Sequence, residues 1–179
     1  QLDYFDERRK DIFMPRESVP MTAGFMKQPW KNFGKVTNQG VEVSLNVNKQ
    51  FGKDLFVSLM GTFTYAHNEI TEKDEPSAVV GTNRAETGHP VGQLTGYIAE
   101  GLFTEDDFED VSTGKLKEGI PTQSFVSKLR PGDIRYRDVN GDGKVDVFDK
   151  SPIGGTEDPE IVYGFGLNMK YKDLDFGAL

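Results

Sequence analysis

The sequence of 179 residues contains no cysteine. This excludes disulfide bonds and thiol catalysis, although it does not fix the redox compartment. The only histidines, His67 and His89, have no cysteine partners, so the sequence does not predict a zinc site. There is no run of about 18 apolar residues of the kind that forms a membrane-spanning helix. The first ten residues also lack the apolar core of a secretory signal peptide.

Basic residues are fewer than acidic ones, and the formal net charge is −8. The imbalance lies in residues 69–160, which contain 20 acidic and 10 basic residues. Acidic surfaces repel phosphate, so a nucleic-acid partner is not predicted. The acidic run 105–110 is interpreted as a solvated loop rather than a pair of catalytic carboxylates. No nucleophile elbow or phosphate-binding glycine loop is present, and we do not predict an enzyme.

Three segments alternate apolar and polar residues with a period of two, which is typical of strands with one apolar face. They are residues 41–48, 55–66 and 161–171, and further strands are expected to begin near residues 2 and 176. The apolar positions are Val41, Val43, Leu45 and Val47 in the first segment, Leu55, Val57, Leu59, Phe63 and Tyr65 in the second, and Ile161, Tyr163, Phe165, Leu167, Met169 and Tyr171 in the third.

Short and long connections alternate along the chain. Short turns are expected at 50–54 and 172–174, and long connections at 14–35 and 69–160. Because antiparallel strands reverse direction each time, the long connections fall on one edge of the sheet and the short ones on the other. This segregation, together with flanking aromatic residues, is typical of an outer-membrane β-barrel. A water-soluble β-sandwich has the same alternation and stays open as an alternative.

Five strands are too few to close a transmembrane barrel, for which eight is the usual minimum. The sequence therefore predicts an all-β fold, namely an antiparallel transmembrane β-barrel fragment of about five strands, belonging to a larger protein. A connection of about ninety residues without any structure is unusual, so 69–160 is expected to carry internal structure. Gly164 and Gly166 lie within a predicted strand and are expected to ease barrel packing.

Residues 138–149, DVNGDGKVDVFD, have the spacing of the twelve-position calcium loop. Gly143 stands where that loop bends sharply, and glycine tolerates the positive φ required there. Side-chain oxygens suit most ligand positions, and the backbone carbonyl of Lys144 suits the seventh. Asp149 would close the site, and it is one methylene shorter than the usual glutamate. The predicted calcium ligands are Asp138, Asn140, Asp142, Lys144, Asp146 and Asp149.

A plain β-hairpin turn is the alternative, because Asn140-Gly141 and Asp142-Gly143 are both strong turn dipeptides. It does not explain four carboxylates within twelve residues, which repel one another in the absence of a cation. An EF-hand is not predicted, since Arg130-Pro131-Gly132 before the loop and Ser151-Pro152 after it break helices. A calcium site on a non-helical scaffold is expected to stabilise structure rather than to sense a signal.

Four stretches of the chain resemble the C-terminal barrel region of SusC-like, RagA-type, TonB-dependent outer-membrane transporters of Bacteroidetes. They are LDYFDERRKDIF, NFGKVTNQGVEVSLN, GHPVGQLTGYIAEGLF, and PGDIRYRDVNGDGKVDVFDKSPIG followed by PEIVYGFGLNMKYKDLDF. Their order and spacing are similar to the family over nearly the whole 179 residues. The third and fourth stretches together are more specific than either alone.

The resemblance implies a 22-stranded barrel with an N-terminal plug and a SusD-like surface lipoprotein as a lid. Such pairs import oligosaccharides or peptides with energy transmitted by TonB. It also implies that 69–160 is an extracellular loop, which the calcium loop would pin in shape. Plug and TonB box are not among these residues, so TonB would be contacted elsewhere. Trp30 and Phe33, expected in the first long connection, would contact ligand or lid or belong to the aromatic girdle.

Two other classes of protein stay open at this stage. One is a soluble, calcium-stabilised, β-rich carbohydrate-binding module, and the other is a fragment of a secreted glycan hydrolase. The apolar faces of the strands distinguish them from a barrel. A barrel exposes Leu55, Val57 and Leu59 to outer-membrane lipid, whereas a soluble module must bury them.

Overall fold

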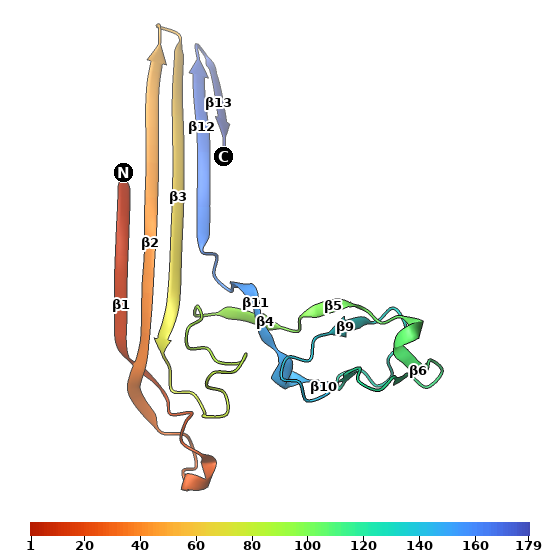
Figure 1. The fold of residues 1–179 in the computed structure, drawn as a ribbon. Helices are drawn as coiled ribbons and strands as arrows, with labels where there is room; N and C mark the ends of the chain where they lie inside the picture. Colours follow the sequence, from red (N-terminus) through yellow and green to blue (C-terminus); the bar gives the residue numbers. More distant parts are fainter.

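The computed structural model describes residues 1–179, the side chain of Met21 excepted. A tall antiparallel sheet of five strands dominates the molecule (Figure 1). Its strands, in spatial order, are β1 (Leu2–Pro15), β2 (Trp30–Phe51), β3 (Leu55–Glu72), β12 (Ile161–Tyr171) and β13 (Leu174–Ala178). The predicted order of strands is confirmed. β3 and β12 pair with each other in the sheet although 88 residues separate them along the chain.

Tight turns join the strands at one end of the sheet and long segments join them at the other, as the parity of the connections predicts (Figure 1). Gly52 has φ 63° in the β2–β3 turn, and Lys172 has φ 54° in the β12–β13 turn. These values fit a reversal of the chain within two or three residues. The N–H of Lys172 also donates to the carbonyl of Asp54 at 2.9 Å, which ties the two turns together.

The first long connection is shorter than predicted. It spans only residues 16–29, because β2 begins at Trp30 and its residues 30–36 pair with residues 9–15 of β1. Trp30 and Phe33 therefore lie in a strand and not in a loop. Residues 30–36 lack the period-two apolar alternation, so backbone pairing alone shows them as strand. Two register shifts near Asp11, where φ is 58°, mark a bulge in β1.

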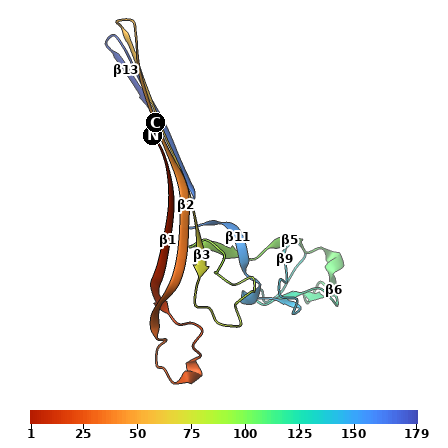
Figure 2. The same ribbon diagram turned by 60° about the vertical axis from the view of Figure 1, so that its left-hand side comes forward.

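The segment between β3 and β12, residues 73–160, forms a separate structure that we call the lateral lobe. Figure 2 shows the sheet nearly edge-on and the lobe projecting from one side of it. The lobe contains the paired strands β4 (Gln93–Gly96) with β11 (Ser151–Thr156), β5 (Ala99–Leu102) with β9 (Ile134–Tyr136), β6 (Phe108–Asp110) with β7 (Lys115–Leu116), and β8 (Thr122–Gln123) with β10 (Lys144–Val145).

The lobe has a small core of its own. Phe103, Phe108 and Leu129 are buried, and the first two rings meet edge to face with centroids 5.9 Å apart. Leu116, Ile120 and Val126 pack around them. The internal structure expected of the long connection is therefore present, and it rests on apolar burial as well as on the acidic turn.

Three short 3-10 segments are the helices of the described chain: η1 (Met21–Ala23), η2 (Glu105–Asp107) and η3 (Val147–Asp149). None of them has the length or apolar character of a membrane-spanning helix. The third closes the acidic turn described below.

Candidate functional site

The register of the sheet places the predicted apolar positions of the three central strands on one face, together with apolar residues of the two edge strands. Residues directly opposite each other in neighbouring strands share a face. Val43 pairs with Leu2 and Phe63, and Phe63 pairs with Tyr163. The face consists of Leu2, Tyr4, Val41, Val43, Leu45, Val47, Phe51, Leu55, Val57, Leu59, Phe63, Tyr65, Ile161, Tyr163, Phe165, Leu167, Met169, Tyr171, Leu174 and Phe176.

This apolar face is not covered by any other part of the described chain. Leu45 is 60 % exposed, Leu59 47 % and Phe165 74 %. A water-soluble sandwich packs such a face against a second sheet, but the five strands form a single layer (Figure 2). The face is therefore open to contact with lipid, as the barrel prediction requires.

The height of the apolar face can be compared with that of a membrane. Aromatic residues stand near its two ends, with Tyr4 and Tyr65 in the row of Val41 and Tyr171 in the row of Phe51. Val41 and Phe51 are separated by about 33 Å along the strand at about 3.3 Å per residue. A strand tilt of about 40° reduces this to about 25 Å, which is the height of the apolar band of outer-membrane barrels.

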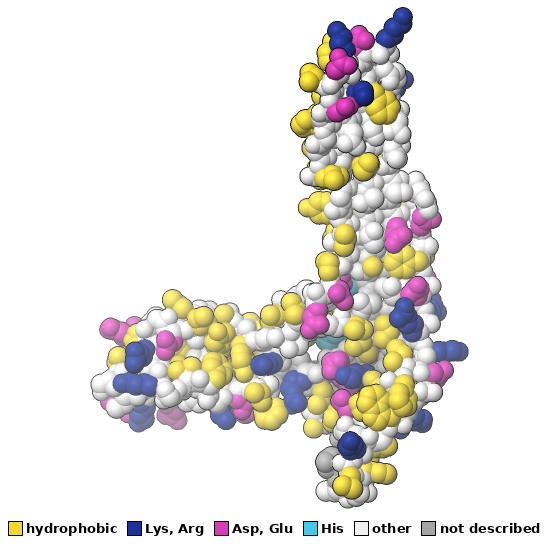
Figure 3. Space-filling view, turned by 180° about the vertical axis from the view of Figure 1, so that it is seen from behind, with side chains coloured by type: hydrophobic (Ala, Val, Ile, Leu, Met, Phe, Trp, Pro, Cys, Tyr) yellow, Lys and Arg dark blue, Asp and Glu magenta, His cyan; other side chains and the backbone are white. Residues whose placement is uncertain are grey.

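Charged residues avoid the middle of the sheet. Residues 43–48, 55–68 and 161–169 contain no Asp, Glu, Lys or Arg. Figure 3, seen from behind, shows charged side chains gathered at both ends of the sheet and over the lobe, and a middle of neutral side chains between them. A stretch of nine uncharged residues, as in β12, matches the 9–11 residues with which a tilted strand crosses a bilayer.

The opposite face of the sheet is mainly polar and small. It carries residues such as Ser44, Asn46, Ser58, Thr62, Thr64, Gly164 and Asn168. Gly166 is also on this face, and a Cβ there would lie 2.9 Å from the Cγ atom of Met60. The glycine makes room for the methionine side chain, as predicted, whereas a Cβ at Gly164 would meet only the Thr62 Oγ1 atom at an ordinary 3.5 Å. A polar inner face is what a barrel lumen requires.

The two long connections are tied together at the end of the sheet away from the tight turns. Asp74 is buried, and its carboxylate contacts the guanidinium Nε of Arg16 at 3.0 Å. It also accepts the N–H of Ser18 at 3.1 Å and its hydroxyl at 2.8 Å. Burial raises the pKa of Asp74, but the hydrogen bonds from Arg16 and Ser18 outweigh burial and lower it overall.

The acidic turn 138–149 is closed by Asp149, whose side chain is fully buried. Its Oδ1 accepts the N–H of Val139 at 2.8 Å and that of Asn140 at 3.3 Å, and its Oδ2 accepts the N–H of Asp146 at 2.7 Å. A buried carboxylate is tolerated when N–H donors of this kind surround it. Asp149 thus joins the two ends of the turn directly.

The other acidic side chains of the turn also accept backbone N–H groups. Asp138 accepts those of Gly141 and Gly143, both at 2.7 Å. The N–H groups of Asp142, Lys144 and Phe148 donate to the side chains of Asn140, Asp142 and Asp146, each at 2.9 Å. These N–H donors partly compensate the negative charges of Asp138, Asp142 and Asp146. Backbone N–H groups therefore offset part of the repulsion among the four carboxylates, whether or not a cation is bound.

The pKa of Asp146 is lowered, first by the N–H of Phe148 and then by the nearby ammonium of Lys144. The Lys144 Nζ lies 3.3 Å from an oxygen of Asp146, so the ammonium group of this lysine faces the acidic turn. Its carbonyl remains available, because β8 uses the carbonyls of Gly143 and Val145 and leaves that of Lys144 on the other side of the strand.

The fit of the turn to calcium is partial. Gly143 has φ 85°, as the sharp bend of a calcium loop requires, and the turn is not the hairpin of the plain alternative, since Lys144 and Val145 pair in parallel with β8. Yet Asp149 directs both oxygens to backbone N–H groups. Among the side chains described, no three His, Cys, Asp or Glu residues gather as a metal site. Calcium at the six predicted ligands stays a prediction.

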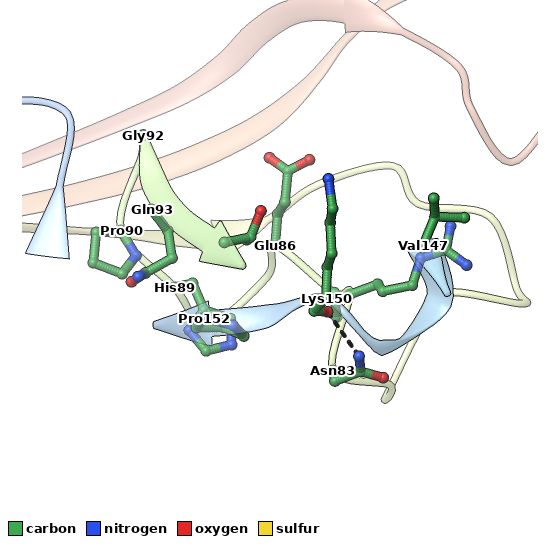
Figure 4. A pocket seen from close by; sticks show the side chains of 12 residues that line it. Asn83, Glu86, His89, Pro90, Gly92, Gln93, Val147, Lys150 and Pro152 are labelled. Carbon is green, nitrogen blue, oxygen red and sulfur yellow. Dashed lines mark hydrogen bonds between the residues drawn. The ribbon is translucent and has the colours of Figure 1, made fainter. Parts of the chain in front are cut away.

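A cavity of about 340 Å³ borders the closing end of this turn (Figure 4). One wall comes from residues 83–95, which lead into and form β4, and the other from Val147, Lys150 and Pro152. The side-chain amide of Asn83 holds the walls together by donating to the carbonyls of Phe148, at 3.0 Å, and Lys150, at 2.7 Å. This cavity could not be predicted from the sequence, because an isolated asparagine has no distinctive pattern.

Two cationic side chains line the cavity without a carboxylate partner. Arg84 lies over the ring of Phe148, 4.8 Å from its centroid, and Lys150 lies 5.7 Å from the centroid of Tyr97. Neither forms an ion pair with the side chains described. Glu86, the acidic residue of the lining, is paired with Lys73 at 2.5 Å. His89 belongs to the lining, and the Nδ1 atom of His67 lies 2.6 Å from the carboxylate of Glu160.

Comparison with known proteins agrees with the geometry of the sheet. The family model of the TonB dependent receptor-like β-barrel matches residues 1–166. The TonB-dependent receptor SusC of Bacteroides thetaiotaomicron is 26 % identical over 173 residues, which cover 94 % of this chain and 16 % of that protein. The TonB-dependent receptor P39 of Formosa agariphila is 26 % identical over 185 residues, covering 90 % of this chain and 18 % of that protein.

Among solved structures, that of the RagAB peptide transporter has the same fold, with a TM-score of 0.61 and 21 % identity. The match covers 98 % of this chain and 18 % of the transporter chain. The chain thus spans about a sixth of the length of the curated relatives it matches. With the family model covering almost all of its strands, the chain belongs to the TonB-dependent receptor β-barrel family.

Proposed function

We propose that the five strands form part of the wall of a larger closed barrel in the outer membrane of a Gram-negative cell. The observation that carries this proposal is the continuous, exposed apolar face of about 25 Å between two rows of aromatic residues. The polar face would line the lumen. The edge strands β1 and β13 would pair with further strands of the barrel, since an unpaired edge has no place in lipid.

The barrel would serve nutrient uptake. The related SusC and P39 are TonB-dependent receptors, and the RagAB assembly is a peptide transporter. By this likeness the protein would import oligosaccharides or peptides with a SusD-like lipoprotein as lid and with energy from TonB. The family is one of receptors, and no enzymatic activity is proposed.

The lateral lobe and the connection 16–29 would face the cell exterior. The tight turns at Gly52 and Lys172 would face the periplasm, since short periplasmic turns and long external loops are the rule for such barrels. The contact of Asp74 with Arg16 and Ser18 would hold the two external segments as one unit.

Calcium in the turn 138–149 would act structurally. The backbone already has the required bend at Gly143, and Asp138, Asn140, Asp142 and the carbonyl of Lys144 lie on successive positions of it. A cation there would add to the N–H bonds that close the turn. No flanking helices exist to transmit an opening motion, so a sensing role is not proposed.

Uptake by living cells tests this function. Removal of the gene for the receptor that contains this chain should abolish uptake of either labelled oligosaccharides or labelled peptides, and restoring it should recover that uptake. A variant with an altered TonB box provides the matched control for energy coupling. Unchanged uptake of both nutrient classes after removal would contradict an import function.

A further inference from the structure

The cavity beside the acidic turn has a charge opposite to that of its surroundings. Residues 69–160 contain twice as many acidic as basic residues. Within the cavity the cations Arg84 and Lys150 have no carboxylate partner, whereas the charge of Glu86 is offset by Lys73. Both side chains are exposed to solvent, so their charges are available to an anion that enters the cavity.

The cations are also held in place. Arg84 is stacked on Phe148 with its guanidinium carbon 4.8 Å from the ring centroid, a geometry that leaves the N–H edges of the guanidinium free to donate. The backbone carbonyl of Lys150 is fixed by Asn83 at 2.7 Å, and Phe148 is fixed in the same way. The contact with Phe148 restrains the guanidinium of Arg84, and the bond from Asn83 fixes the backbone that carries Lys150, which lowers the entropic cost of binding an anion.

The remaining lining suits a sugar ring. Gln93 uses its amide N–H groups on the carbonyls of Leu94 and Gly155, which leaves its side-chain oxygen as an acceptor. Thr95 adds a hydroxyl, and Pro90 and Pro152 supply apolar surface (Figure 4). The volume of about 340 Å³ falls at the lower end of the range of small-molecule sites, about 300–1,000 Å³.

From these observations we infer that the cavity is a binding subsite for an anionic sugar unit, one that bears a carboxylate or a sulfate group. Arg84 and Lys150 bind the anionic group, and Gln93 and Thr95 bind hydroxyls. The inference names a substrate class for the proposed import function. It rests on that function only for the role of the site in the cell. The binding itself is a property of this chain.

Binding to the purified, detergent-solubilised receptor that contains this chain tests the inference. The probes are glucuronate, galactose 6-sulfate, glucose, free acetate and free sulfate, measured by calorimetry. Glucuronate or galactose 6-sulfate should bind, and the one that binds identifies the anionic group. In the double variant R84Q/K150Q its Kd should rise about tenfold or more, since hydrogen bonds to charged groups are strong. Lys117→Ala removes another lobe cation that lacks an ion pair and lies outside the cavity, and it should leave the Kd unchanged.

The inference is overturned if neither charged sugar binds, if glucose binds as tightly as they do, if free sulfate or acetate binds as tightly as the sugars, or if R84Q/K150Q binds with the unchanged Kd. Limited proteolysis of the lobe shows whether that variant keeps its fold. Should it lose its fold, the single variant K150Q replaces it. Charged-sugar binding without uptake by cells would contradict the import function alone, and uptake without such binding would contradict this inference alone.

Discussion

The side-chain amide of Asn83 lies 2.7 Å from the carbonyl oxygen of Lys150, across 67 residues of sequence. The same amide reaches the carbonyl of Phe148 at 3.0 Å. These bonds join the start of the lateral lobe to the segment that leaves the acidic turn. They bring together two walls of a cavity whose residues are far apart in the chain.

Asn83→Ala should loosen this junction. Two carbonyls lose their donor, and because these bonds are exposed to water the cost should be about 0.5–1.5 kcal/mol of local stability. Hydrogen exchange of residues 147–152 should speed up accordingly, while exchange in β2 and β3 stays unchanged. Asn46→Ala, on the polar face of β2, is the matched control. Equal exchange in the two variants would show that Asn83 does not hold the junction.

Arginine substitutions test the two faces of the sheet. Leu59→Arg places a charge on the apolar face near its middle and should destabilise the barrel by about 2–4 kcal/mol. Thr62→Arg, on the opposite face only three residues away, should cost much less. Unfolding of both variants from lipid vesicles gives the comparison. Similar costs at the two positions would mean that the faces are wrongly assigned.

Lowering the pH should release the contact between Asp74 and Ser18. The pKa of Asp74 is below its ordinary value near 3.9 in the folded protein, so its ionised form contributes stability in full above that value. The contribution is lost as the pH falls through the lowered folded pKa. Exchange of the Ser18 amide should therefore remain slow from about pH 7 to 4 and rise below pH 4. In Asp74→Asn, exchange should be faster at neutral pH and lack this acid step.

Calcium should protect the acidic turn from protease. We expect added calcium to slow cleavage of the lobe and a chelator to restore it, because a cation joins side chains spread over twelve residues. Asp142→Ala should abolish this calcium dependence and leave the strands intact. Asp149→Ala should weaken the turn even without metal, since the N–H groups of Val139, Asn140 and Asp146 lose their acceptor. Identical cleavage of the natural protein with calcium and with chelator would exclude the site.

The sheet could be predicted because its strands are long enough for the side-chain alternation to mark one apolar and one polar face. Residues 41–48 and 55–66 show it, and the register confirms both faces. The first part of β2, from Trp30, could not be predicted in this way, because it extends beyond the apolar band and is held by backbone pairing to β1.

The structure of the lateral lobe could not be predicted from side-chain alternation either. Its strands have two to six residues, too few for a period to show, and its bonds join distant residues such as Asn83 and Lys150. The acidic turn could be located from its spacing. Its closure by Asp149 onto backbone N–H groups could not, since sequence spacing does not say whether a carboxylate faces a cation or a peptide group.

The sidedness of the sheet tests the central claim most directly. Single cysteines at Lys53, in the β2–β3 turn, and Thr113, in the lobe, are both exposed positions in a chain without cysteine of its own. In the intact receptor on whole cells, an impermeant thiol reagent should label the Thr113 position and spare the Lys53 position until the outer membrane is permeabilised. Equal labelling of both positions on intact cells would contradict an outer-membrane barrel.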